Sequence, residues 1–105
     1  MLANKLKIGD TIGVIAPDKA LKNKDIKYLE NATKYFESLG LKVKYGKYLF
    51  SEDNYCAGTP KERAKDLNDM FSDKEIKAIF TVKGGDMVNG ILPYIEFKNI
   101  KSNPK

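Results

Sequence analysis

Residues 11–16 have the sequence TIGVIA, a short run of mainly β-branched apolar residues. Gly9 and Asp10 precede this run and Pro17 and Asp18 follow it, so turn-forming residues bound it on both sides. A continuous apolar run of this length is typical of a strand that is buried on both faces, as in a parallel sheet. We therefore predict that residues 11–16 form an interior strand.

The residues after this run alternate between helical and strand patterns. Apolar side chains recur at helical spacing over residues 23–39, and Gly40 supplies the left-handed residue that ends many helices. Residues 41–45 alternate apolar and polar side chains with the period of two that a half-covered strand shows. We therefore predict a helix and a second strand, which we place nearer the sheet edge than residues 11–16.

A long loop precedes the second helix. Residues 46–59 lack sustained periodicity, so we predict a loop there, with room for one helical turn at residues 51–54. Thr59 and Pro60 are typical of a helix N-terminus, since the hydroxyl can cap the helix and proline is favoured at its first position. An apolar face at helical spacing then predicts a helix over residues 60–71.

The third predicted strand, residues 76–82, ends in a glycine turn. Lys83, Gly84 and Gly85 follow it, where a sharp turn costs little backbone strain, and residues 87–95 have the pattern of a short helix. Strands and helices thus alternate along the chain with right-handed crossovers. This order predicts an α/β fold, an open parallel sheet with flanking helices in a Rossmann- or flavodoxin-like three-layer arrangement.

Ligands of such sheets bind at the carboxyl ends of the strands. Three predicted loops lie at that edge, namely residues 16–18, 46–58 and 83–89. Asp18 is a candidate ligand contact there, although an aspartate after proline is also an ordinary turn opener.

Composition limits the class of protein. The chain has 105 residues, 42% of them hydrophobic, which suits one domain or part of one. No run approaches the ~20 apolar residues of a membrane span, and residues 1–10 lack the apolar centre of a signal peptide. We therefore expect a cytoplasmic protein without a membrane partner. Because lysines that produce the net charge of +5 are spread among acidic residues, we also expect no nucleic-acid partner.

Histidine is absent, and cysteine occurs once, as Cys56. Without histidine the chain contains no Ser–His or Cys–His pair for nucleophilic catalysis. One thiol without histidine cannot build a structural zinc site, and we predict neither metal nor cofactor. We interpret Cys56 as a packing residue, because a thiol without a basic partner is poorly activated.

The Gly84-Gly85 pair between a strand and a helix is a candidate anion site. Unpaired N–H groups at the start of a helix point outward and can bind an anion or an oxyanion. The pair matches neither the dinucleotide-binding fingerprint nor the phosphate-loop spacing. A glycine turn without a function explains the same two residues.

Three segments together carry a family resemblance. They are LKIGDTI at residues 6–12 with IAP at 15–17, AGTPKERAKDLN at 57–68, and residues 79–95 with the Gly-Gly pair and ILPYI. In order and spacing these segments resemble the LD-carboxypeptidase family of serine peptidases, which includes muropeptide LD-carboxypeptidases and microcin C immunity peptidases. The resemblance extends from about residue 6 to residue 105. It implies that residues 1–105 are a partial N-terminal α/β domain and that the family's C-terminal domain is absent.

The resemblance places the family's catalytic serine three residues after the Gly-Gly pair, where this chain has Val88. The count needs no gap, because the glycines on one side and Leu92-Pro93 on the other determine it. Neither Asp86 nor Asn89 stands at the correct position to replace the serine. The family's other two catalytic residues, a glutamate and a histidine, come from its C-terminal domain.

The resemblance also implies a function for the backbone of the turn. Family members form an oxyanion hole from amides around this turn, and the matching groups are the N–H groups of Gly85 and Asn89. Main-chain donors do not depend on side-chain identity, so they could still bind a carboxylate. Gly84 and Asp86 are the neighbouring candidates for substrate binding. An equally simple interpretation is that Asn89 only caps or stabilises the turn.

Other polar and aromatic residues have structural interpretations beside functional ones. Arg63 matches an arginine in the family's helix motif, and we expect it to form helix-face or inter-element ion pairs with residues such as Asp66. Tyrosines around the long loop either line a cleft or cover the edge of the core. These are Tyr45, Tyr48 and Tyr55.

We therefore expect a fragment or degenerate copy of an LD-carboxypeptidase-like serine peptidase that is inactive as this chain. The alternative is a non-catalytic binding module that holds an anionic, peptide-like small molecule at the glycine turn. Residues 103–105 resemble the family segment just before another strand, so the strand at 76–82 should lack one neighbour. We expect it to pair with another copy and to form a homodimer or a higher oligomer.

Overall fold

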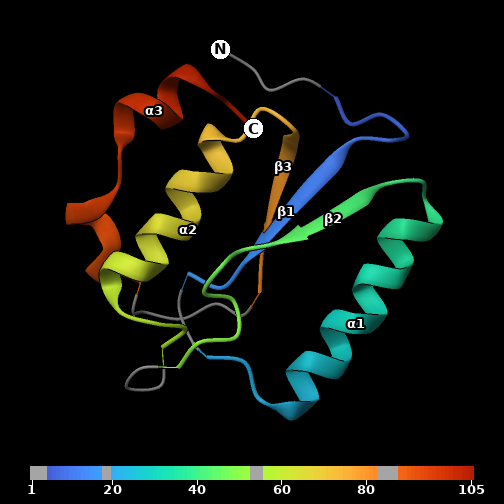
Figure 1. Ribbon diagram of the computed structural model, residues 1–105, viewed down its shortest axis with the longest axis horizontal. Coiled ribbons are helices and arrows are strands. Elements are labelled where there is room, and N and C mark those ends of the chain that lie inside the picture. Colours follow the sequence, from blue (N-terminus) through green and yellow to red (C-terminus); the bar gives the residue numbers. More distant parts are fainter. Residues whose placement is uncertain (1–4, 18–19, 53–55, 83–87) are drawn as a thin grey trace.

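A computed structural model describes residues 5–17, 20–52, 56–82 and 88–105, with the side chains of residues 88 and 89 left out. Three parallel strands and four helical segments follow one another in these ranges (Figure 1). In chain order they are β1 (Thr11–Ile15), α1 (Asn23–Ser38), β2 (Lys42–Tyr45), α2 (Pro60–Ser72), β3 (Ile76–Thr81), the 3-10 helix η1 (Val88–Tyr94) and α3 (Phe97–Ser102). The predicted α/β class is confirmed, and each predicted strand lies within a residue or two of its expected bounds.

The sheet has the order β2-β1-β3, with β1 in the centre. Ile12, Val14 and Ile15 of β1 are almost completely buried, whereas β2 has one partly buried residue among exposed ones. The prediction that β1 is interior and β2 lies at an edge is therefore confirmed. The pairing of β1 with β3 shifts between Thr11 and Ile12, which makes Lys77 an extra residue in β3.

Helices cover the two faces of the sheet. In Figure 1 the strands lie between α1 on one side and α2 on the other. Leu29 of α1 joins the core cluster that contains Val14, and Met70 of α2 joins a second cluster with Ile15 and Ile76. The result is the predicted three-layer arrangement, in which an apolar central strand contacts a helix on each face.

Two glycines carry specific backbone roles. Gly40 follows α1 with a φ of 86°, the left-handed conformation that its position in the sequence predicts. Gly46 follows β2, where an added Cβ would lie 2.6 Å from Asp66 Oδ2 and 2.9 Å from Ile15 Cγ2. Gly46 therefore permits the chain to pass close to α2 as it leaves the sheet.

The C-terminal helices differ from the prediction. The segment expected as one short helix over residues 87–95 is a 3-10 helix over Val88–Tyr94 that contains Pro93. A further helix, α3, had no counterpart in the sequence prediction, because six residues are too few to show helical periodicity. Asn99 of α3 donates to Ser72 Oγ over 2.8 Å, so a tertiary contact with α2 helps to hold this helix. No helix in the described ranges has the length and apolar character needed to cross a membrane.

Candidate functional site

The carboxyl ends of the strands lead into the three predicted loops, and the structure describes part of each. Gly84, Gly85, Asp86 and Asp18, all predicted site residues, lie outside the described residues. Val88 and Asn89 are described by their backbone alone, as the first two residues of η1. The position predicted for the nucleophile thus begins the helical segment that follows β3.

The N-terminus of α2 is capped as the sequence predicts. Thr59 Oγ1 accepts a hydrogen bond from the N–H of Glu62 over 3.2 Å, and the Glu62 carboxylate accepts one from the N–H of Thr59 over 2.9 Å. This reciprocal pair satisfies two N–H groups that a helix start leaves unpaired. Glu62 is therefore a capping residue, which determines where α2 begins and how its side chains are directed.

Arg63 connects α2 with the loop after β1. Its side chain is 4% exposed, and Nη1 donates to the carbonyl oxygen of Pro17 over 2.9 Å. Its Nη2 lies 3.8 Å from the position that a Cβ on Gly90 would take, so the guanidinium also lies beside η1. Arg63 thus joins the loop after β1 to η1.

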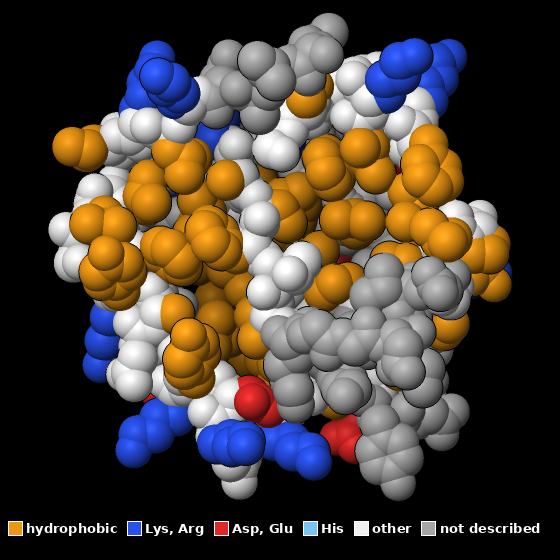
Figure 2. Space-filling view, turned by 180° about the vertical axis from the view of Figure 1, so that it is seen from behind, with side chains coloured by type: hydrophobic (Ala, Val, Ile, Leu, Met, Phe, Trp, Pro, Cys, Tyr) orange, Lys and Arg blue, Asp and Glu red, His pale blue; other side chains and the backbone are white. Residues whose placement is uncertain are grey.

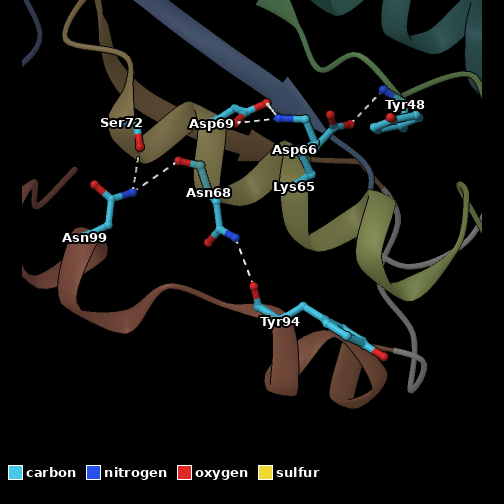
Figure 3. Close-up of polar contacts among 8 residues, drawn as sticks. All are labelled: Tyr48, Lys65, Asp66, Asn68, Asp69, Ser72, Tyr94 and Asn99. Atoms are coloured by element: carbon cyan, nitrogen blue, oxygen red, sulfur yellow. Dashed lines mark hydrogen bonds and ion pairs between the residues drawn. The ribbon is translucent and has the colours of Figure 1, made fainter.

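Asp66 connects α2 with the loop after β2 (Figure 3). Its side chain is buried, and Oδ2 accepts a hydrogen bond from the N–H of Tyr48 over 2.9 Å. Burial raises the pKa of this carboxyl above its ordinary value, although backbone N–H groups of Tyr48 and Lys47 act in the opposite direction. The carboxylate holds the chain as it turns away from β2.

Asn68 connects α2 with the segment between η1 and α3. Its amide donates to the carbonyl oxygen of Tyr94 and accepts from the N–H of Glu96, both over 3.0 Å. The side chain is buried and points away from the sheet toward η1, as Figure 3 shows. Asn99 of α3 adds a hydrogen bond to the carbonyl oxygen of Asn68. Both ends of this asparagine amide are therefore used to position main chain.

Three residues within about one and a half turns of α2 thus position the segments that lead from the three strands. The expectation of ion pairs is wrong for Asp66, whose contact with the neighbouring loop is a hydrogen bond to a backbone N–H group. For Arg63 the inter-element contact was expected, but the group it binds, a backbone carbonyl, was not. Every residue carries backbone groups, so the sequence does not show which of them a charged side chain will bind. Charged side chains were therefore the partners that the sequence suggested for Arg63 and Asp66. Asn68 was not singled out as a site residue, and its place on the helical face was the only available signal.

The contacts of the described tyrosines around the long loop and of Cys56 are those of packing residues. Tyr45 donates or accepts a 2.6 Å hydrogen bond with Thr33 Oγ1, and its ring meets Phe50 edge-on at 5.8 Å between centroids. Tyr48 is half-buried beneath the ammonium of Lys47, and Tyr55 lies outside the described residues. Cys56 is buried, which agrees with its interpretation as a packing residue. Tyr45 covers the edge between α1 and β2, as the alternative interpretation predicts.

The described part of this edge can position loops but holds no complete catalytic group. The sequence has no histidine, and within the described ranges no three potential ligands gather to hold a metal ion. The side chains of Arg63, Asp66 and Asn68 face the backbone of neighbouring segments. These three side chains therefore hold the loops in place at the carboxyl ends of the strands.

Comparisons with known proteins agree with this architecture. The chain is 43% identical over 100 residues to the probable murein peptide carboxypeptidase of Bacillus subtilis (strain 168), a match that covers 95% of this chain and 30% of that protein. It is 33% identical to the microcin C7 self-immunity protein MccF of Escherichia coli, over 100% of this chain and 30% of MccF. A solved structure of MccF in complex with glutamyl sulfamoyl guanosine superposes with a TM-score of 0.92 at 32% identity, over 99% of this chain and 31% of that one.

The chain therefore spans about 30% of the length of the curated relatives that it matches. The family described as the LD-carboxypeptidase N-terminal domain matches residues 12–105, which include nearly all of the strands and helices of the structure. Since this match and the superposition cover nearly the whole chain, the protein belongs to the LD-carboxypeptidase family, in the region of that family's N-terminal domain.

Proposed function

We propose that this chain is an N-terminal fragment or a degenerate copy of an LD-carboxypeptidase-like serine peptidase, which retains the scaffold but does not hydrolyse peptides as this chain alone. One observation carries the proposal: Val88 begins η1, and by the resemblance of the sequence motifs we assign this position to the family's serine. Valine has no nucleophilic atom, so the acyl-transfer step cannot begin from this position.

The mechanism of the family explains why a chain without the serine and the histidine should not catalyse hydrolysis. In the family that the sequence resembles, the serine attacks the scissile carbonyl, a histidine acts as base, and a glutamate orients that histidine. Turn amides, here those of Gly85 and Asn89, hold the oxyanion that forms. This chain has no histidine, so a nucleophile restored at position 88 would still lack its base.

The names of the relatives support a substrate class. One relative is named a probable murein peptide carboxypeptidase, and MccF has been solved in complex with glutamyl sulfamoyl guanosine. We propose that the ancestral site accepted L,D-peptide bonds of muropeptides or amide bonds of peptidyl nucleotides. We also propose that the chain is located in the cytoplasm, as expected from the sequence.

Incubation of the purified chain with an L,D-tetrapeptide, followed by mass spectrometry, tests the proposal. We expect no release of the terminal D-alanine above buffer, whereas the Bacillus subtilis relative serves as a reference for activity under the same conditions. Turnover that copurifies with the chain through a second, orthogonal column would overturn the proposal.

Calorimetry with the same tetrapeptide separates loss of catalysis from retention of binding. If the turn amides bind the C-terminal carboxylate, titration of the free peptide should release heat. Titration of the peptide with an amidated C-terminus should not, because amidation removes the anionic group. Binding without hydrolysis would establish the alternative function, that of a binding module for an anionic peptide terminus.

A further inference from the structure

Arg63, the only arginine in the sequence, differs from the lysines in its burial. Every lysine that the structure describes is at least partly exposed, and in Figure 2 the cationic side chains lie mainly around the rim of the molecule. Arg63 is 4% exposed. Burial of a charged side chain costs free energy unless polar contacts compensate for the lost hydration. The contacts of this guanidinium therefore indicate why the chain has an arginine here.

The first turn of α2 directs the Arg63 side chain toward η1. The N–H of Arg63 donates to the carbonyl oxygen of Thr59 over 2.9 Å, so the capped helix start fixes the backbone of Arg63. Pro60 lies three residues earlier, on the same face of the helix. The position that a Cβ on Gly90 would take lies 4.0 Å from Pro60 Cγ and 3.8 Å from Arg63 Nη2. This turn of α2 is therefore packed beside the beginning of η1.

Other contacts hold the middle and the end of η1. Ile91 is 1% exposed, and the Asn68 amide donates to the carbonyl oxygen of Tyr94 over 3.0 Å. The first two residues of η1 carry the position predicted for the nucleophile and the N–H group of Asn89. Because Arg63 lies beside the residue that follows them, its contact is at the end of η1 that carries the predicted site.

The loop after β1 is the second segment that Arg63 contacts. Its Nη1 donates to the carbonyl oxygen of Pro17 over 2.9 Å. Close by in the chain, Ile15 of β1 accepts a hydrogen bond from the N–H of Val82, also over 2.9 Å. Residues 83–87, which include the Gly-Gly pair, connect Val82 to η1. The chain on either side of residues 83–87 is thus connected to the end of β1, on one side by the backbone and on the other through Arg63.

We propose that Arg63 is a positioning residue for the glycine-turn site, which sets where η1 begins relative to the ends of β1 and β3. A guanidinium is a planar fork of donors, so one nitrogen can bind a carbonyl while another lies against a second segment. The ammonium of lysine is a single point charge without this geometry. The relative placement of the Gly85 and Asn89 N–H groups then depends on Arg63. This last consequence rests on the proposed binding function, whereas the placement of η1 does not.

Two substitutions separate the two contacts. Arg63→Met keeps a long side chain but removes the guanidinium donors, and Arg63→Lys keeps one nitrogen donor. NMR follows the Pro17 carbonyl carbon, whose chemical shift reports its hydrogen bond, and hydrogen exchange at the Ile91 amide of η1. For Arg63→Met we expect the Pro17 signal to move and the Ile91 amide to exchange at least about tenfold faster relative to Val14 of β1. For Arg63→Lys we expect the faster exchange at Ile91 with the Pro17 signal retained.

Lys61→Met is the matched control on the same turn of α2. Lys61 is exposed, and its ammonium lies 5.6 Å from the centre of the Tyr94 ring, so it is a cation beside the far end of η1. We expect this variant to change neither signal. Equal acceleration at Ile91 and Val14 in the Arg63 variants would indicate a general loss of stability and would overturn the proposal. Wild-type exchange at Ile91 in Arg63→Lys would overturn it as well, and this variant decides the question if circular dichroism shows that Arg63→Met has not folded.

Calorimetry with the L,D-tetrapeptide extends the test to the site itself. If the unchanged chain binds the peptide, we expect Arg63→Lys to bind it at least about tenfold more weakly and Lys61→Met to bind it equally well. Equal binding by Arg63→Lys would overturn the connection between Arg63 and the turn. If the unchanged chain does not bind the peptide, the proposed binding function is wrong, and exchange at Ile91 still decides whether Arg63 positions η1.

Discussion

Asp66 shows how one buried carboxylate is stabilised and destabilised at the same time. The side chain accepts the N–H of Tyr48, which favours the charged form, but burial favours the neutral form more strongly. The pKa of Asp66 in the folded chain is consequently raised above its value in the unfolded chain. Holding the loop after β2 with a carboxylate therefore costs stability at neutral pH.

The pH dependence of stability provides the first prediction, through Asp66→Asn. Because the folded pKa of Asp66 is raised, its contribution to stability is fully present below the unfolded pKa and is lost as pH rises through the folded pKa. The substituted amide would keep an acceptor oxygen but would not titrate. We therefore expect wild type to gain free energy of unfolding relative to Asp66→Asn as pH falls from about 7 to about 3.5.

Urea unfolding at several pH values measures this difference. Asp69→Asn is the control, since Asp69 is an exposed acid on the same helix and pairs with Lys65 at the surface. A stability difference between wild type and Asp66→Asn that stays constant, or that moves in favour of the variant on acidification, contradicts the prediction.

Gly46 provides the second prediction at the residue scale. A Cβ at this position would meet Asp66 Oδ2 at 2.6 Å and Ile15 Cγ2 at 2.9 Å, both closer than ordinary contacts. We expect Gly46→Ala to lower the free energy of unfolding by about 1–3 kcal/mol, the usual cost of forcing extra atoms into a packed site. Gly90→Ala is a matched control, because its nearest atoms lie at 3.8 and 4.0 Å. Chemical denaturation of both variants is the measurement, and equal stability would refute the packing argument.

At the scale of elements, α2 connects the sheet to the C-terminal segment. Its apolar side packs Met70 against β1 and β3, while Asn68 holds the chain between η1 and α3. Lys105 adds a contact at the other end of α2, where its ammonium donates to the carbonyl of Met70 over 2.8 Å. A cation at a helix C-terminus is favourable because it meets unpaired carbonyl groups.

The third prediction concerns Asn68→Ala. The change leaves the Tyr94 carbonyl and the Glu96 N–H without the side chain that binds both, and the loss of such partners typically costs about 1–3 kcal/mol. Lys65→Ala is the control on the same helix, since it breaks an exposed ion pair that contributes less than about 1 kcal/mol. We expect the larger loss in urea unfolding for Asn68→Ala, together with faster hydrogen exchange at the Glu96 amide. Unchanged exchange at Glu96 would show that Asn68 does not hold this segment.

At the scale of the molecule, the described fold is held by packing and by hydrogen bonds from α2. The fold superposes on MccF with a TM-score of 0.92, although this sequence has no histidine. Packing of apolar faces and hydrogen bonds from α2 hold the architecture, and neither depends on a nucleophile.

The fourth prediction is that Val88→Ser alone does not react with a fluorophosphonate probe. A serine hydroxyl without a basic partner stays protonated and is a weak nucleophile. We expect a label only when the Val88→Ser chain replaces the matching N-terminal region of the Bacillus subtilis relative, and no label when the same hybrid keeps valine. Gel fluorescence and intact mass report the label. Rapid labelling of Val88→Ser in the isolated chain would contradict the prediction.

The sequence by itself determined the elements whose signals are local. The apolar run of β1, the left-handed Gly40 and the helix start at Thr59 and Pro60 depend on residues close together in the chain, so they can be inferred from spacing. The prediction that position 88 matches the family's serine likewise rests on counting from the Gly-Gly pair in the sequence. These features did not require knowledge of which segments meet in space.

Only the tertiary structure decided which groups meet across the chain. Arg63 binds a carbonyl 46 residues away, and Asn68 holds a backbone segment that begins 26 residues later. The bulge at Lys77 and the short helix α3 depend in the same way on neighbours from other elements. Every residue carries the same backbone N–H and C=O groups apart from proline, so the sequence does not mark which of them a buried side chain will bind. Chain folding selects the partner by bringing that group within hydrogen-bonding distance.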